Sequence, residues 1–255
     1  MGMPVVLVHG LRTSRTMWRY QVEALERAGH RAIAVDLPGH GARLDEPFTL
    51  DAAVETVRGA LAEAVATVAA APDEVPRALL VGLSLGGYTA IATAARHPQH
   101  VAGLVAASCS TRPASAVLST WGVAARGIGA LPDRGARLNQ SLVDRTLPAA
   151  GAADVGAGGY ALDATVPVLR AMREAHPLDD LARVEAPVWI VNGSLDHFRG
   201  EERRFVGACR DGRLVVVPRA THLVSLVQPV RFTRVLLEAL DELEANRSST
   251  PSRAN

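Results

Sequence analysis

The sequence is short of cysteine, of net charge and of long apolar runs, and each shortage excludes a class of protein. Its only cysteines, Cys109 and Cys209, match no metal-ligand spacing, and we interpret both as buried small residues in a reducing compartment. A net charge of +1 indicates neither a nucleic-acid partner nor an anionic membrane surface. No apolar run has the length of a membrane span, and the first residues show no basic leader with a cleavage site. We therefore expect a cytoplasmic protein without a membrane span.

What the sequence does contain is an alternation of short apolar runs with helical patterns. Strands are predicted at residues 4–8, 31–35, 78–81, 101–107, 187–192 and 214–218. Helices are predicted at 17–28, 49–70, 88–96, 201–209 and 229–245. Strands that are apolar throughout and alternate with helices are typical of a parallel sheet covered on both faces. We predict a doubly wound α/β fold with about six strands.

One long stretch interrupts this alternation. Residues 110–180 contain no strand-like run, several short helical pieces and a segment dense in glycine and alanine, and they are too many for a plain crossover. We predict a helical cap at 110–180, inserted into a core made of residues 1–109 and 181–247. The polar residues 248–255 are expected to be a disordered tail.

The third strand leads into a motif with chemical meaning. Gly82-Leu83-Ser84-Leu85-Gly86 fits the pattern G-x-S-x-G, and it stands between a predicted strand and a predicted helix. Bulky side chains two positions either side of the serine would collide in so sharp a turn, and glycine removes them. Ser84 would then lie at a helix N-terminus, where negative charge is favoured. Ser84 is the candidate nucleophile, although a glycine-rich turn with an incidental serine gives the same pattern.

A serine nucleophile needs a base, and the base needs an acid to orient it. Ligands of parallel sheets bind at the carboxyl ends of strands, so residues that follow strands are the candidates. His222 follows the last strand and Asp196 follows the fifth. The other histidines after Ser84 are less suitable, since His197 is adjacent to Asp196 and the remaining three lie at the far end of a helix or in the cap: His97, His100 and His176.

These motifs together resemble the α/β-hydrolase superfamily, most closely its small cap-bearing esterases and lipases. The resemblance covers about 3–109 and 181–245, and it rests on His9-Gly10, the turn at 36–41, the motif at 82–86, Asp196 and His222. It implies that the backbone N–H groups of Leu11 and Leu85 form an oxyanion hole. Two departures stand out, because the family's two additional N-terminal strands have no counterpart and Ala42 replaces the usual serine. Asp36, His40 and Trp18 are interpreted as structural or pocket-lining residues.

A serine at the elbow excludes the dehalogenases and epoxide hydrolases of this superfamily, which need aspartate there. We predict hydrolysis of a carboxylic ester or thioester of a small to medium, largely apolar substrate, without a metal or cofactor. The same triad could serve a C–C bond hydrolase or a cofactor-free lyase, and the fold could also carry a non-hydrolytic binding protein. Candidate pocket residues, which could equally be cap core, are Trp18, Leu118, Trp121, Leu142, Tyr160, Val166 and Met172.

Overall fold

The computed structural model describes residues 2–66, 68, 75–113, 116–133 and 135–249, and its centre is a single parallel sheet. The strands are ordered β2-β1-β3-β4-β5-β6, and every neighbouring pair is parallel. Their bounds are β1 Val5–Val8, β2 Ala32–Val35, β3 Ala78–Leu83, β4 Val101–Ala107, β5 Val188–Gly193 and β6 Gly212–Val217. The predicted six-stranded doubly wound fold is confirmed, and each predicted strand overlaps an observed one.

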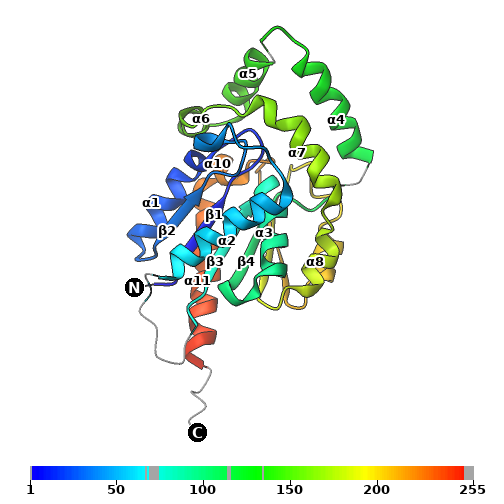
Figure 1. Ribbon diagram of the computed structural model, residues 1–255. Coiled ribbons are helices and arrows are strands. Elements are labelled where there is room, and N and C mark those ends of the chain that lie inside the picture. The colour runs from blue at the N-terminus through cyan, green and yellow to red at the C-terminus, as the bar shows by residue number, and fades with distance from the viewer. Residues whose placement is uncertain (1, 67, 69–74, 114–115, 134, 250–255) are drawn as a thin grey trace.

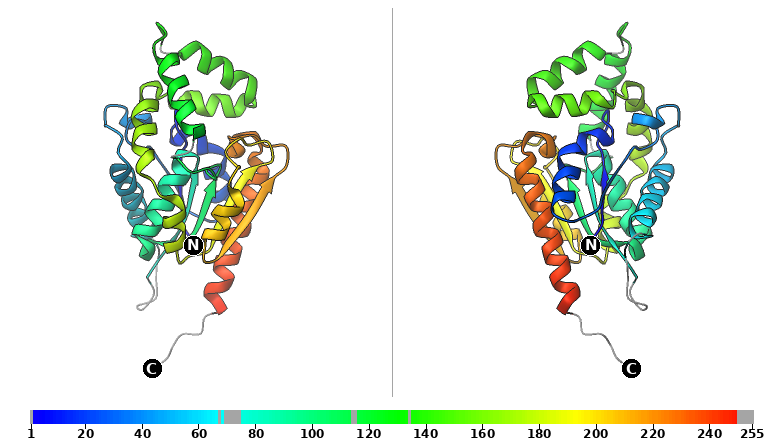
Figure 2. Two further views of the ribbon diagram at one scale, coloured as in Figure 1. Left: turned by 90° about the vertical axis from the view of Figure 1, so that its right-hand side faces the viewer. Right: turned by 90° about the vertical axis from the view of Figure 1, so that its left-hand side faces the viewer.

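Helices cover both faces of this sheet, which is why the central strands are apolar throughout. One face carries α2, α3, α8 and α9, and the other carries α1, α10 and α11 (Figure 1, Figure 2). The α-helices of the two faces are α1 Arg19–Arg27, α2 Leu50–Ala66, α3 Leu85–Arg96, α8 Pro177–Arg183, α9 Glu202–Ala208, α10 Val224–Val227 and α11 Pro229–Ser249. Short 3-10 helices are η1 Arg15–Trp18, η2 Gly41–Arg43 and η3 Pro98–His100.

The segment between β4 and β5 forms helices beyond the carboxyl ends of the strands (Figure 1). These elements are α4 Ala116–Gly129, α5 Ala136–Thr146, α6 Ala149–Ala157, η4 Leu162–Ala164, α7 Thr165–Ala171 and η5 Met172–Glu174. No strand occurs among the described residues of this segment, as the sequence analysis expected. Whether it behaves as a separate cap stays a prediction. The boundary expected between this segment and the core, at 180/181, falls inside α8. Leu181 of α8 packs in the core on the face of the sheet that also carries α2 and α3.

Two details differ from expectation. Helix α11 continues to Ser249, so the first two residues of the expected tail, 248 and 249, are helical, while 250–255 lie outside the described residues. Helix α10 was not anticipated, because a single turn of four residues is too short to show helical periodicity. No helix in the described ranges combines the length and the apolar character that a membrane crossing requires.

Candidate active site

The turn between β3 and α3 holds Ser84 in a strained backbone conformation. Its φ of 55° and ψ of −115° lie outside the regions that L-residues usually adopt. A hydrogen bond of 2.8 Å from the Ser84 N–H to the carbonyl of Ala107, the last residue of β4, joins the turn to that neighbouring strand. A Cβ atom at Gly82 would collide with the Gly86 carbonyl, and one at Gly86 would collide with the Val8 carbonyl. Both flanking glycines are therefore required by the close approach of backbone.

Ser84 is hydrogen-bonded to His222, and His222 is hydrogen-bonded to Asp196. The Ser84 Oγ lies 2.9 Å from the His222 Nε2, and the His222 Nδ1 lies 3.0 Å from the Asp196 Oδ1. The Asp196 side chain is fully buried, whereas the His222 side chain is 21% exposed. The three residues come from the loops after β3, β5 and β6, which parallel pairing brings to one edge of the sheet.

The protonation states of these hydrogen-bonded residues follow from the environment of Asp196. Burial acts to raise its pKa, but the hydrogen bond and charge of His222 and a 2.8 Å hydrogen bond from the Phe198 N–H outweigh burial. The pKa of Asp196 lies below its ordinary value, so its carboxylate is ionised at neutral pH. An ionised carboxylate can only accept, so the His222 Nδ1 carries a proton. The Nε2 of a neutral His222 is then free to accept the Ser84 hydroxyl proton.

Two backbone N–H groups near Ser84 in the chain or in the fold have no hydrogen-bond partner among the described residues. Leu85 is the first residue of α3, and Leu11 lies in the loop after β1. Within the described residues neither N–H donates a hydrogen bond to another group. Unpartnered N–H groups at a helix N-terminus and a neighbouring loop are suited to bind an oxyanion.

A cavity of about 250 Å³ opens beside Ser84. Its floor consists of residues that follow strands, and helices α4 and α7 cover it. The described residues that line it are Gly10, Leu11, Arg12, Ser84, Ala124, Ala125, Ile128, Thr165, Leu169, His197, Phe198, His222 and Leu223. Apart from Ser84, His222 and Leu11, none of these was named as a site residue from the sequence.

Four of the residues expected to line the pocket are absent from the lining of the Ser84 cavity. Trp18 is fully buried against Phe232, with ring centroids 5.9 Å apart, and Met172 is buried in the core on the other face of the sheet. We therefore assign Trp18 and Met172 to the core. The Tyr160 hydroxyl donates to Gln140 at 2.9 Å and lines a different cavity, and Leu142 is 51% exposed on α5.

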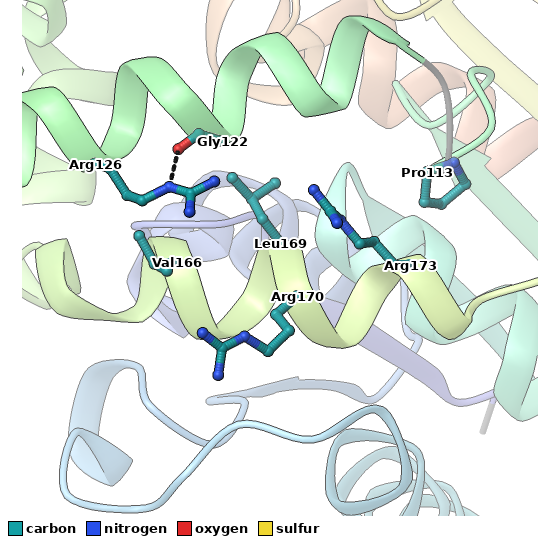
Figure 3. Close-up of a pocket in the computed structure, with 7 residues that line it drawn as sticks. All are labelled: Pro113, Gly122, Arg126, Val166, Leu169, Arg170 and Arg173. Atoms are coloured by element: carbon teal, nitrogen blue, oxygen red, sulfur yellow. Dashed lines mark hydrogen bonds between the residues drawn. The ribbon is translucent and has the colours of Figure 1, made fainter.

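The remaining pocket candidates are on α4 and α7. Leu118 and Trp121 belong to α4, but their side chains lie outside the described part of the structure. Val166 faces a groove outside the Ser84 cavity, between α4 and α7 (Figure 3). Arg126 and Arg173 lie on either side of Leu169 in this groove, which Arg170 of α7 also lines (Figure 3). Leu169 lines both the groove and the Ser84 cavity, so it separates the two.

Two aromatic rings lie beside His222. The rings of His197 and Phe198 lie with their centroids 5.1 and 4.8 Å from that of His222. Burial and the nearby charge of His222 lower the pKa of His197, so this ring is neutral at neutral pH and packs as an aromatic surface. His97 and His100 lie at the C-terminal end of α3, away from Ser84, and His176 begins α8.

The loop after β1 is held by two buried polar residues. His9 donates from Nδ1 to the Gly10 carbonyl at 2.7 Å and accepts at Nε2 from the Leu37 N–H at 3.0 Å. Asp36 accepts from the N–H groups of Arg15 at 2.7 Å and Ala42 at 3.0 Å. These contacts join the loop after β1 to the loop after β2. The structural interpretation of Asp36 agrees with this arrangement, and His9 supports the loop that carries Leu11.

Comparison with known proteins identifies the family of this chain. Residues 5–235 match the alpha/beta hydrolase family, and the chain belongs to that family. A probable esterase, PIR7A of Oryza sativa subsp. indica, is 43% identical over 107 residues, covering 41% of this chain and 38% of that protein. A pimeloyl-acyl-carrier-protein methyl ester esterase of Edwardsiella ictaluri is 37% identical over 107 residues, covering 42% and 36%. The chain thus spans less than two fifths of the length of these relatives.

Among solved structures, a thermophilic esterase from Thermogutta terrifontis superposes with a TM-score of 0.76. It is 25% identical to this chain, and the match covers 95% of this chain and 91% of the esterase. The similarity therefore includes the segment between β4 and β5 as well as the sheet.

Proposed function

We propose that the protein is a serine hydrolase that cleaves carboxylic esters through an acyl-enzyme intermediate on Ser84. The observation that carries this proposal is the continuous chain of hydrogen bonds from Ser84 through His222 to Asp196, with distances of 2.9 and 3.0 Å. A hydroxyl, an imidazole and a carboxylate in this order are the nucleophile, base and orienting acid of acyl transfer.

The reaction runs in two halves. His222 Nε2 removes the hydroxyl proton while the Ser84 Oγ attacks the carbonyl carbon, and the Leu11 and Leu85 N–H groups donate to the resulting oxyanion. When the oxyanion collapses, the alkoxide leaves with the proton held by His222, and the acyl group stays on Ser84. A water molecule then gives a proton to His222 and attacks the acyl carbon. The proton returns to Ser84 as the carboxylic acid is released.

The cavity indicates the kind of substrate. Its volume of about 250 Å³ admits a small to medium acyl group, and Ala124, Ala125, Ile128 and Leu169 offer it apolar contact. A thioester reacts by the same steps. We propose that α4 to α7, within residues 110–180, act as a cap over the core formed by 1–109 and 181–247. Both cysteines are free thiols, which supports a cytoplasmic location.

Steady-state hydrolysis of ester and thioester series with increasing acyl length tests the proposal. We expect turnover of short and medium acyl groups by the wild type and a loss of roughly 10⁴- to 10⁶-fold in kcat for Ser84→Ala, which keeps the fold. Turnover of vinylogous diketones without turnover of any ester would instead indicate a C–C bond hydrolase. Equal rates of ester hydrolysis for the wild type and Ser84→Ala would contradict the assignment of the nucleophile.

A further inference from the structure

Arg12 is the one permanently charged residue among the described residues that line the Ser84 cavity. It directly follows Leu11 in the loop after β1, and it lines the cavity together with Leu11 and Ser84. Its φ of 62° lies in the left-handed region, which a residue with a side chain adopts at some cost. Outside the proposed catalytic machinery, the other polar side chains of the lining are the uncharged Thr165 and His197, so a guanidinium in this lining needs an explanation.

The Arg12 guanidinium is fixed at one point and otherwise unpartnered. Its Nε donates to the Thr165 Oγ1 of α7 at 2.8 Å, while neither Nη1 nor Nη2 makes a hydrogen bond within the described residues. The hydrogen bond to Thr165 therefore leaves Nη1 and Nη2 of Arg12 available to a ligand. The four remaining N–H donors, on Nη1 and Nη2, lie in one plane and can bind the two oxygens of a carboxylate.

No acidic side chain of the described chain neutralises Arg12. The neighbouring arginines differ in this respect, because Arg15 pairs with Asp36 at 3.6 Å and Arg19 pairs with Asp154 at 2.6 Å. Arg12 is partly buried, and burial lowers its pKa without a compensating negative charge. Withdrawing a cation from water without a counter-ion costs free energy that an anionic ligand would recover.

We propose that Arg12 binds a carboxylate carried by the substrate, so that the preferred substrates are esters with a free carboxylate a few bonds from the scissile carbonyl. This rests on the proposed ester hydrolysis at Ser84. A single guanidinium balances the single charge of a carboxylate, whereas a phosphate monoester would leave negative charge in an otherwise apolar cavity. The apolar residues of α4 and α7 would contact the carbon chain between the ester and the carboxylate.

Matched pairs of substrates test this inference. In the first pair the charge is on the acyl side: monomethyl glutarate is compared with the methyl ester in which an isopropyl group replaces the carboxylate. The acetyl ester of para-hydroxybenzoate is compared with that of para-isopropylphenol, which puts the charge on the alcohol side. In at least one pair we expect the wild type to prefer the anionic ester in kcat/KM. Arg12→Gln should reduce that preference by about 10- to 100-fold, the usual effect of losing a bidentate charge-assisted contact.

Further variants separate a direct contact from a general positive field. Arg126→Gln and Arg173→Gln remove charges from the groove across Leu169, and they should leave the preference nearly unchanged. Arg12→Lys keeps the charge without the fork and should retain part of the preference. Arg12→Asn, a residue that tolerates a positive φ, provides a second neutral variant if Arg12→Gln melts early. No preference in either pair, or an equal loss in the groove variants, would overturn the role of Arg12.

A binding measurement separates failure of this inference from failure of the proposed reaction. Monomethyl glutarate is titrated by calorimetry into Ser84→Ala with and without Arg12→Gln. If binding to Ser84→Ala depends on Arg12 while the wild type hydrolyses no ester, the carboxylate site is supported and the proposed function is refuted. Hydrolysis of the neutral esters without Arg12-dependent binding would support the function and refute the carboxylate site.

Discussion

Acid should destabilise this protein through one histidine remote from bulk solvent. His9 is completely buried, and its Nε2 must stay unprotonated to accept the Leu37 N–H. Burial, and then the proximity of His40, lower the pKa of His9 to about 3 from 6.5. Between these two pH values the unfolded chain binds a proton that the folded chain does not, so the free energy of unfolding falls as pH falls through this window.

The size of the effect follows from the two pKa values. Going from about pH 7 to about pH 5, the linkage at His9 removes about 2 kcal/mol from the free energy of unfolding, and the whole window corresponds to about 5 kcal/mol. Urea unfolding at both pH values measures this loss for the wild type and for His9→Gln, which keeps polar atoms but does not titrate. We expect the variant to be less stable at neutral pH and to lose about 2 kcal/mol less on acidification.

Other groups that titrate in this range affect the wild type and His9→Gln alike. The difference between the stability that the two proteins lose on acidification therefore measures the contribution of His9. His176→Gln is the matched control, because it removes an imidazole from an exposed position at the start of α8. It should show the same loss as the wild type. If His9→Gln also loses as much stability on acidification as the wild type, then His9 is not held neutral by burial and the reasoning fails.

Three further predictions concern the triad and its turn. Asp196→Asn should lower kcat for a neutral ester by about 10⁴-fold, because the amide no longer orients the His222 tautomer that accepts a proton; a loss below tenfold would contradict this. His222→Ala should abolish turnover. His197→Ala should have a milder effect, because among the described residues no hydrogen bond is seen between its ring and Ser84, whereas His222 makes one. The reverse order on one substrate would identify His197 as the base. Gly86→Ala should lower the free energy of unfolding by about 3 kcal/mol or prevent folding, because the new Cβ would collide with backbone carbonyls. Gly59→Ala on α2 should raise it by about 0.5–1 kcal/mol, because the new Cβ meets open space. Urea midpoints of the two glycine variants give this comparison.

The sheet and the triad candidates could be predicted because both depend on local patterns. Each strand is a short apolar run, and parallel pairing necessarily brings the ends of β3, β5 and β6 to one edge. Ser84, Asp196 and His222 each follow one of those strands. Their proximity was therefore a consequence of the topology, although the distances of 2.9 and 3.0 Å needed coordinates.

The lining of the cavity could not be predicted in the same way. It depends on how α4 and α7 lie over the strand ends, and nothing in their local sequence determines that placement. The sequence suggests large apolar side chains as the lining, but Trp18 packs in the core while the small residues Ala124 and Ala125 line the cavity. Arg12 resembled an ordinary loop residue, and its position directly after Leu11 was the only signal that could have identified it.

The most direct test of the central claim is the reaction of the intact protein with a fluorophosphonate, measured by mass spectrometry. An activated Ser84 should be labelled once, the adduct should map to the peptide that contains Ser84, and Ser84→Ala should not react. His222→Ala should be labelled far more slowly, because the hydroxyl has lost its base. Absence of labelling in the folded wild type, or labelling that persists in Ser84→Ala, would contradict a serine hydrolase built on this triad.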